Sequence, residues 1–238
     1  MSRVAALLAW AALALACTGQ ARARPPVPAP LPLHESPVPG SDRLVILLSG
    51  DGGWRALVRG IDAELNRQGV AVVGWNSLGY FWQRRTPQQA GADLARVIED
   101  YTRRWHVREV ALVGYSFGAD VLPFLYNALP AGTRARVRFV ALLGLAPQAD
   151  FKARAGGWLG WGPRRPVAVL PQVARMPAAR VQCIHGREER DSLCPRLAAL
   201  GVAVASAPGG HHFQGDAAGL ARIVVQGWRR TPPLPATG

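Results

Sequence analysis

Lysine is nearly missing from this 238-residue sequence, and motifs for nucleic-acid binding are missing altogether. Lys152 is the only lysine, so arginine supplies almost all of the 28 basic residues, which stand against 15 acidic ones and give a net charge of +13. The arginines are scattered and form no groove with interleaved aromatic residues. The glycine-rich stretch Ser49–Trp54 also lacks the Gly-Lys-Ser/Thr ending of a nucleotide-binding loop. We therefore expect no nucleic-acid partner and favour anionic lipid headgroups as the target of this charge.

The N-terminal apolar run, Val4–Ala16, is too short to span a membrane comfortably. Arg3 precedes it, and small residues at the spacing read by a signal peptidase follow, which predicts a signal peptide over residues 1–23. A lipid anchor at Cys17 is the less favoured alternative. Both interpretations place the mature domain outside the cytoplasm.

Cysteine is scarce, with three residues in the chain. If Cys17 leaves with the signal peptide, Cys183 and Cys194 remain as a pair. An oxidising compartment allows them to be joined, so we predict a disulfide between them.

The rest of the chain predicts one domain without internal repeats. A proline-rich lead-in (residues 24–42) precedes a domain over residues 43–230 and a short tail, residues 231–238. Apolar runs of strand length alternate with helical segments, which indicates an α/β fold with a mostly parallel sheet of about six strands and helices on both faces. The irregular segment 146–178 is expected to form a lid. The predicted strands are 44–48, 70–75, 109–113, 137–145, 180–184 and 202–206, and the predicted helices are 56–68, 87–105, 119–129, 192–200 and 216–228.

The pattern Gly114-Tyr-Ser-Phe-Gly118 follows one predicted strand and precedes a helix. This context is typical of the nucleophile elbow of α/β-hydrolases, in which a sharp turn presents the serine at the edge of the sheet. Ser116 is therefore the candidate nucleophile. The fold class expected is the α/β-hydrolase fold.

The base and acid should follow the nucleophile in the chain, acid first. His211 and His212 come after the last predicted strand; we favour His211 because it directly follows two glycines. The acid should lie after the fifth strand, where Glu189 stands three residues past a glycine and Asp191 is the alternative. Cys183 and Cys194 bracket that loop, so a disulfide would hold the acid in place.

An oxyanion hole requires two backbone donors. One is expected to be the amide of Phe117, directly after the nucleophile, and the other an amide of Asp51 or Gly52 after the first strand.

Several motifs together resemble the VirJ/AcvB family of bacterial virulence proteins over about residues 43–228, and the length is similar to the short, single-domain VirJ form. They are Ser49-Gly-Asp-Gly-Gly-Trp54, Ser77-Leu-Gly-Tyr-Phe-Trp82, Gly114-Tyr-Ser-Phe-Gly-Ala-Asp-Val-Leu-Pro123, the Cys183 to Cys194 segment and Gly209-Gly-His-His-Phe213. The resemblance implies a periplasmic α/β-hydrolase. In the AcvB branch this enzyme removes the amino acid from lysyl-phosphatidylglycerol. VirJ-type members are also tied to type IV secretion of virulence factors, so secretion-system or virulence proteins are possible partners.

The implied substrate at the membrane surface, an aminoacylated phospholipid, suggests further site residues. A cationic aminoacyl group favours nearby carboxylates, for which Asp51, Asp120 and Asp150 are candidates. Tyr80 and Trp82 are candidates for lining an acyl-chain path. No metal or cofactor is needed for this chemistry. The alternatives are a general periplasmic esterase or thioesterase, and a non-catalytic accessory or chaperone of a secretion system.

Overall fold

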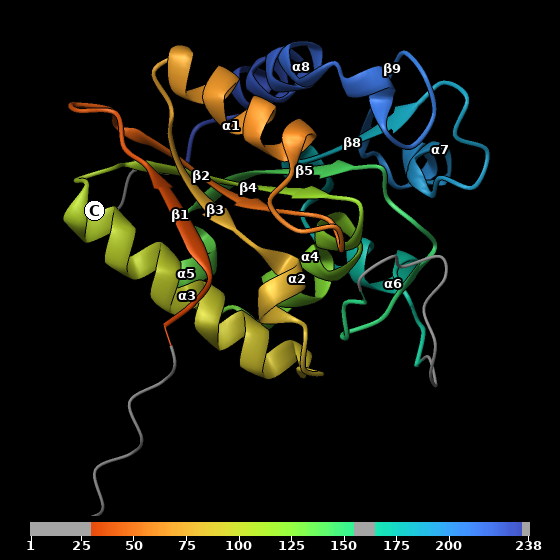
Figure 1. The fold of residues 1–238 in the computed structure, drawn as a ribbon, viewed down its shortest axis with the longest axis horizontal. Helices are drawn as coiled ribbons and strands as arrows, with labels where there is room; N and C mark the ends of the chain where they lie inside the picture. The colour runs from red at the N-terminus through yellow and green to blue at the C-terminus, as the bar shows by residue number, and fades with distance from the viewer. Residues whose placement is uncertain (1–29, 155–164, 235–238) are drawn as a thin grey trace, which may run out of the picture. The chain divides into compact units, whose positions relative to one another are not determined.

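The computed structural model describes residues 30–154 and 165–234. From Leu31 onward the described residues belong to one unit, built on one large twisted sheet with helices above and below it (Figure 1). The predicted signal peptide, including Cys17, lies outside the described residues, as do residues 155–164 of the predicted lid. No helix among the described residues is long and apolar enough to cross a membrane.

Within the described residues the main sheet has seven strands in the order β1-β3-β2-β4-β5-β8-β9. Neighbouring strands are parallel throughout, except that β1 pairs antiparallel with β3. A parallel sheet of this kind gathers the carboxyl ends of its strands along one edge, where ligands bind. The strands are β1 (Leu33–Ser36), β2 (Arg43–Leu48), β3 (Ala71–Trp75), β4 (Glu109–Tyr115), β5 (Val137–Leu143), β8 (Val181–Gly186) and β9 (Ala203–Ala207).

Helices cover both faces of the sheet. In Figure 1, α1 and α8 lie above it, and α2, α3, α4, α5 and α6 lie below. Thr86 and Gln89 form a reciprocal capping box that starts α3, with Pro87 in the first turn. The helices are α1 (Ala56–Arg67), α2 (Ser77–Tyr80), α3 (Pro87–Arg104), α4 (Phe117–Ala128), α5 (Ala131–Ala135), α6 (Leu170–Val173), α7 (Cys194–Leu197) and α8 (Ala217–Arg230), with short 3₁₀ turns at Ala178–Arg180, Ala198–Leu200 and Phe213–Gly215.

The core consists of two apolar layers, one on each face of the sheet. Strand β2 supplies both, because successive side chains point to opposite faces. Leu44 and Ile46 join the layer that contains α3 and α4, and Val45 and Leu47 join the layer that contains α1 and α8. All four are fully buried. A strand covered on both faces reads as a continuous apolar run, which is why this strand was recognisable in the sequence.

Two segments differ from the sequence prediction. The six predicted strands correspond to β2, β3, β4, β5, β8 and β9, but the proline-rich lead-in adds a seventh strand, β1, at the sheet edge. Prolines are tolerated at the ends of an edge strand, which is how this segment joins the sheet. The predicted lid contains the two-stranded sheet of β6 (Gln148–Ala149) and β7 (Val167–Ala168), followed by α6.

Candidate active site

Ser116 lies in a strained turn between β4 and α4. Its backbone has φ 53° and ψ −123°, a conformation that is unfavourable for a residue with a side chain. Two flanking glycines make the turn possible. A Cβ on Gly114 would lie 2.6 Å from the carbonyl oxygen of Gly118, and one on Gly118 would lie 2.6 Å from the carbonyl oxygens of Leu48 and Ser49. The Gly-X-Ser-X-Gly pattern therefore reflects close backbone packing around the serine.

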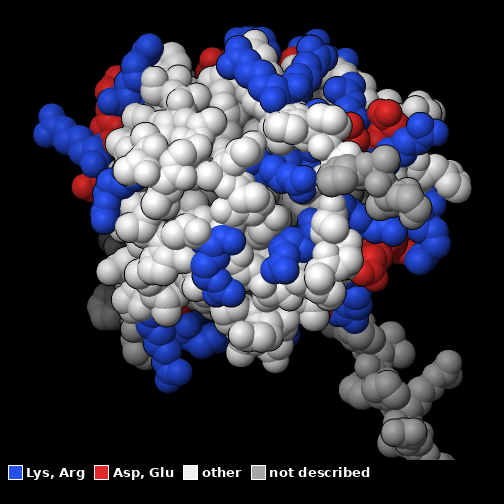
Figure 2. Space-filling view, turned by 180° about the vertical axis from the view of Figure 1, so that it is seen from behind, with Lys and Arg blue, Asp and Glu red and all other residues white. Residues whose placement is uncertain are grey.

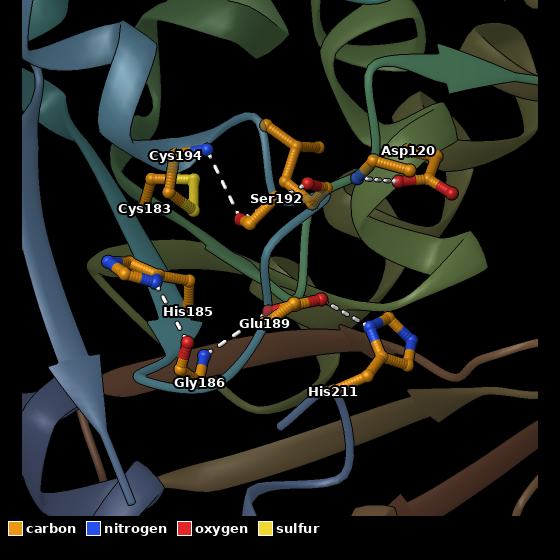
Figure 3. Close-up of a disulfide and its surroundings, with 10 residues drawn as sticks. Asp120, Cys183, His185, Gly186, Glu189, Ser192, Cys194 and His211 are labelled. Carbon is orange, nitrogen blue, oxygen red and sulfur yellow. Dashed lines mark hydrogen bonds and ion pairs between the residues drawn. A yellow bond between two sulfur atoms is a disulfide. The ribbon is translucent and has the colours of Figure 1, made fainter. Parts of the chain in front are cut away.

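His211 links the serine to an acid. Its Nε2 atom is 2.8 Å from Oγ of Ser116, and its Nδ1 atom is 2.5 Å from Oε1 of Glu189. Glu189 is itself held in a turn after β8: its Oε2 accepts a hydrogen bond from the amide of Gly186 at 3.2 Å, and its amide donates to the Gly186 carbonyl at 3.0 Å. Figure 3 shows Glu189 between Gly186 and His211. The three side chains of Ser116, His211 and Glu189 thus form one hydrogen-bonded chain.

The electrostatic surroundings favour a protonated His211. The hydrogen bond to Glu189 raises the pKa of His211, burial opposes this, and the negative charges of Glu189, Asp120 and Asp51 raise it further. An imidazole with a raised pKa stabilises the proton it takes from a hydroxyl. A general base with a raised pKa keeps the proton while the reaction intermediate exists, as the proposed chemistry of His211 requires.

The alternative residues for these positions lie elsewhere. Nδ1 of His212 is 2.8 Å from the hydroxyl of Tyr115. His212 is therefore not a member of the hydrogen-bonded chain formed by Ser116, His211 and Glu189. Asp191 is exposed to solvent. Of the two histidines and two acids weighed in the sequence, the structure brings His211 and Glu189 to Ser116.

The expected oxyanion donors flank Ser116. Phe117 is the first residue of α4, so its amide N–H has no acceptor within the helix. The glycine loop (Ser49–Trp54) passes on the other side: a Cβ built on Gly50 would lie 3.3 Å from Cβ of Ser116. The amide of Asp51 follows directly, and Gly52 is exposed one residue further on. The loop therefore comes close to the serine at Gly50, next to the predicted donors.

Asp120 lies one turn into α4 and faces the same region. Its Oδ1 accepts a hydrogen bond from the amide of Ala146 at 2.8 Å (Figure 3). Burial raises the pKa of Asp120 to about 8, and the negative charges of Asp51 and Glu189 add to this, while the Ala146 amide and His211 oppose it. Asp51, Asp120 and Glu189 thus form an acidic environment around His211.

The other predicted substrate contacts have different surroundings. Asp150 forms ion pairs with Arg84 at 2.5 Å and Arg154 at 2.9 Å, so its charge is already compensated. Burial raises its pKa, but the hydrogen bonds from these two arginines outweigh it, and the pKa lies below its ordinary value. Tyr80 is 3% exposed and donates its hydroxyl to Asp93 at 2.5 Å. Tyr80 is therefore a core residue, whereas Trp82 is 59% exposed.

Cys183 and Cys194 form a disulfide, with their Cα atoms 5.3 Å apart. Cys183 lies in β8 and Cys194 begins α7, so the bond closes the loop that carries Glu189 (Figure 3). Both cysteines are fully buried. The predicted pairing is confirmed.

Sequence reasoning missed Gly144, which follows β5 with φ 65°. A Cβ at this position would lie 3.0 Å from Cε1 of His211 and 3.6 Å from Oε1 of Glu189, so only glycine leaves room for the two side chains. It also missed Tyr115 as the partner of His212. The one available indication that Gly144 and Tyr115 belong to the site was their position, since each stands at the carboxyl end of a predicted strand.

The arrangement suits nucleophilic attack by a serine on a carbonyl group. It combines a half-buried serine hydroxyl, a base within hydrogen-bond distance, an acid that orients the base, and two loops with amides beside the serine. Among residues 30–154 and 165–234, no group of three or more His, Cys, Asp or Glu side chains is arranged to hold a metal ion.

Comparison with solved structures identifies the fold. Est1E from Butyrivibrio proteoclasticus superposes with a TM-score of 0.54 at 14% identity, covering 82% of this chain and 92% of that one. The esterase Pf2001 of Pyrococcus furiosus gives a TM-score of 0.55 at 13% identity, with 84% and 91% coverage. The thioesterase domain from the curacin biosynthetic pathway gives 0.55 at 15% identity, with 81% and 94% coverage. The chain has the α/β-hydrolase fold, as predicted.

Sequence comparison gives a family. No curated protein sequence matches the chain significantly. The family model described as bacterial virulence protein (VirJ) matches residues 42–232, which include the glycine loop, the Ser116 turn, Glu189 and His211. The chain therefore belongs to the VirJ family of bacterial virulence proteins.

Proposed function

We propose that this protein is a serine hydrolase that removes the amino acid from aminoacyl esters of phospholipid, with lysyl-phosphatidylglycerol as substrate, in the periplasm. The observation that carries the proposal is the hydrogen-bonded chain from Ser116 through His211 to Glu189, held in a strained turn. The resemblance to the AcvB branch motivates the substrate, and the predicted signal peptide motivates the compartment.

In the first half-reaction, Oγ of Ser116 attacks the ester carbonyl carbon while Nε2 of His211 takes the hydroxyl proton. Glu189 keeps the imidazole oriented and stabilises its positive charge. The amides of Phe117 and Asp51 donate hydrogen bonds to the oxyanion of the tetrahedral intermediate. As this intermediate collapses, His211 returns its proton to the departing glycerol oxygen, which leaves phosphatidylglycerol and an aminoacyl ester of Ser116.

In the second half-reaction, water attacks the aminoacyl ester and His211 takes one of its protons. The second tetrahedral intermediate uses the same two amides. Its collapse breaks the bond to Oγ of Ser116, which takes the proton back from His211 and frees the amino acid. The net reaction consumes one water molecule and releases phosphatidylglycerol and the amino acid.

The acidic surroundings of His211 support a cationic substrate. Asp51 contributes negative charge near the imidazole, and Asp120, whose pKa is about 8, adds to it when it is ionised; one oxygen of Asp120 accepts a hydrogen bond from the Ala146 amide. An ammonium group beside Asp120 would lower its pKa and favour its ionised form. We assign Asp120 and Asp51 to the ammonium groups of the lysyl moiety, and leave out Asp150, whose charge is paired.

The surface of the protein supports work at an anionic membrane. The net charge is +13, and Figure 2 shows one face with Lys and Arg side chains across its middle and acidic side chains mostly toward its edges. Exposed Trp82 follows Phe81, whose ring lies 5.2 Å from that of Phe117. An exposed tryptophan near the catalytic serine is suited to the headgroup region of a bilayer.

The test is incubation of the purified full chain with vesicles that contain lysyl-phosphatidylglycerol, followed by measurement of free lysine and lipid composition. Ser116→Ala is the matched variant, because alanine keeps the fold of the turn and removes only the hydroxyl. Release of lysine and phosphatidylglycerol by the parent alone supports the proposal. Absence of release by a folded parent contradicts it; if short neutral esters are then hydrolysed, the protein is a general esterase.

A further inference from the structure

An open cavity borders the glycine loop. It has a volume of about 620 Å³ and lies between the start of α1, the strand β1 and the segment that follows β3. Two arginines, Arg55 and Arg59, line it, together with Gly52 and Trp54. None of the steps described above uses this cavity.

The two arginines lack acidic partners. Arg55 and Arg59 are four residues apart, so they lie on the same side of the first turn of α1. No ion pair found among residues 30–154 and 165–234 involves either guanidinium group. Arg67, at the other end of the same helix, is in contrast paired with Glu64. Two like charges on one cavity repel each other, and an anion bound between them would offset this repulsion.

The cavity has a rigid wall. The ring of Trp54 stacks on that of His34, with centroids 4.9 Å apart and an angle of 13° between the planes. Behind it, Trp54 packs so closely on Gly74 that a Cβ there would lie 2.1 Å from the indole. Arg55 is also fixed, because its Nε donates to the carbonyl of Gly52 at 2.8 Å. The charged groups are thus presented on an ordered surface.

The cavity adjoins the catalytic serine through the glycine loop. Gly50 is in near contact with Ser116, and Gly52, which lines the cavity, is two residues further along the chain. Two residues span at most about 7 Å, so the edge of the cavity lies close to the position of the scissile ester. This short separation between the serine and the cavity edge suits a substrate in which a glycerol unit joins the ester to the phosphate.

We propose that Arg55 and Arg59 form a subsite for a glycerol-linked phosphate, the phosphodiester of the alcohol that leaves in the first half-reaction. The identity of the substrate rests on the function proposed above, but the anion site itself does not. Guanidinium groups match phosphate oxygens in geometry and form charge-assisted hydrogen bonds with them. The acidic side chains around His211 and the arginines of this cavity then bind opposite charges of the same lipid.

The first experiment measures binding of sn-glycerol 3-phosphate to the full chain by calorimetry, in the parent and in Arg55→Gln, Arg59→Gln and Arg67→Gln. Loss of one charge-assisted contact is expected to weaken binding about tenfold or more in each of the first two variants. Arg67→Gln removes the same charge from the same helix outside the cavity and should leave the affinity unchanged. Equal affinity in all four proteins, or no binding to the parent, overturns the proposal.

Arg59→Gln is the more decisive variant. Arg55 also donates a hydrogen bond to the backbone of Gly52, so Arg55→Gln could weaken binding by altering the glycine loop alone. If only Arg55→Gln weakens binding, the arginine acts through the glycine loop and the subsite assignment fails. Inorganic phosphate forms a second arm. The proposal expects it to bind more weakly than sn-glycerol 3-phosphate, and equal binding would mean that the site takes free phosphate and not the lipid headgroup.

A third arm separates this inference from the proposed function. With vesicles of lysyl-phosphatidylglycerol, Arg59→Gln should lower kcat/KM about tenfold more than it does for a neutral acyl ester. If the parent releases no lysine but its binding of sn-glycerol 3-phosphate still depends on both arginines, the subsite stands and the proposed substrate fails. If lysine is released equally by parent and Arg59→Gln, the substrate stands and the subsite fails.

Discussion

Nδ1 of His212 lies 2.8 Å from the hydroxyl of Tyr115, the residue directly before Ser116. This contact separates the functions of two adjacent histidines, since it engages the His212 ring while Nε2 of His211 lies 2.8 Å from the serine hydroxyl. The side chains of residues 115 and 116 are therefore each within hydrogen-bond distance of a different member of the pair. The sequence alone offered no such distinction, because both histidines follow the same two glycines.

The pH dependence should report the pKa of His211, which its hydrogen bond to Glu189 raises. A base must be neutral to accept a proton, so kcat/KM should fall as the pH drops through a value above the ordinary histidine pKa of about 6.5. Glu189→Gln removes the main cause of the raised pKa. We expect the acidic limb to move to lower pH and the maximum rate to fall about 10²- to 10⁴-fold.

Asp191→Asn is the matched control for Glu189→Gln, since it neutralises an exposed carboxylate of the same loop. Its pH profile should coincide with that of the parent. If the acidic limb shifts in Asp191→Asn and not in Glu189→Gln, then Asp191, and not Glu189, is the acid that raises the pKa of His211.

Asp120→Asn should affect substrates according to their charge. The asparagine keeps an oxygen that accepts from the Ala146 amide, so the local structure is retained. We expect kcat/KM for a lysyl ester to fall about tenfold relative to a neutral ester of similar size. Because the pKa of Asp120 is about 8, KM for the lysyl ester should also decrease as pH rises toward 8 in the parent, and not in the variant. Equal losses for both substrates would assign Asp120 a purely structural function.

Close packing around the serine turn predicts a large difference between two glycines. Gly118→Ala places a Cβ 2.6 Å from two backbone carbonyl oxygens and should lower the free energy of unfolding by about 2–3 kcal/mol. Gly132→Ala, within α5, meets nothing within 4 Å and should be neutral or stabilising by about 0.5 kcal/mol. Urea unfolding measures both. Equal stability of the two variants would be inconsistent with this packing.

The disulfide should stabilise the domain and position the acid. Replacement of Cys183 and Cys194 by alanine opens a loop closed over a sequence separation of 11 residues and should cost about 2–3 kcal/mol. Because the loop carries Glu189, kcat should fall as well. Thermal unfolding and kinetics, with and without a reductant, measure these effects. Two free thiols in protein recovered from the periplasm would remove the basis of this prediction.

The sequence was informative where local patterns correspond to local structure. Buried parallel strands appear in the sequence as apolar runs. The serine turn appears as Gly-X-Ser-X-Gly because glycine is required where the backbone packs so closely. Strand β1 was missed because the prolines on either side of it indicate a lead-in, and because its pairing with β3 depends on a segment nearly forty residues away in the chain. The surroundings of Tyr80 were unpredictable for a similar reason: its hydroxyl partner, Asp93, lies on α3, so the aromatic ring that suggested an acyl-chain path is held in the core.

The charge partners were the least predictable part of the site. Asp120 and Asp150 were equivalent candidates in the sequence, but two arginines compensate only Asp150. Gly144 carries no chemical signal, yet the place of its missing side chain is occupied by His211. Such relations depend on how separate loops meet at the sheet edge, and residue type alone does not encode them.

The most direct test of the central claim is the mass of the intact protein after treatment with a fluorophosphonate, which reacts with activated serines. The account predicts one adduct, located on Ser116, that forms rapidly in the parent and in His212→Gln. It predicts no adduct in Ser116→Ala and labelling slowed at least about 100-fold in His211→Gln. An unmodified, folded parent protein, or an adduct on another residue, would contradict the assignment of Ser116 as the nucleophile.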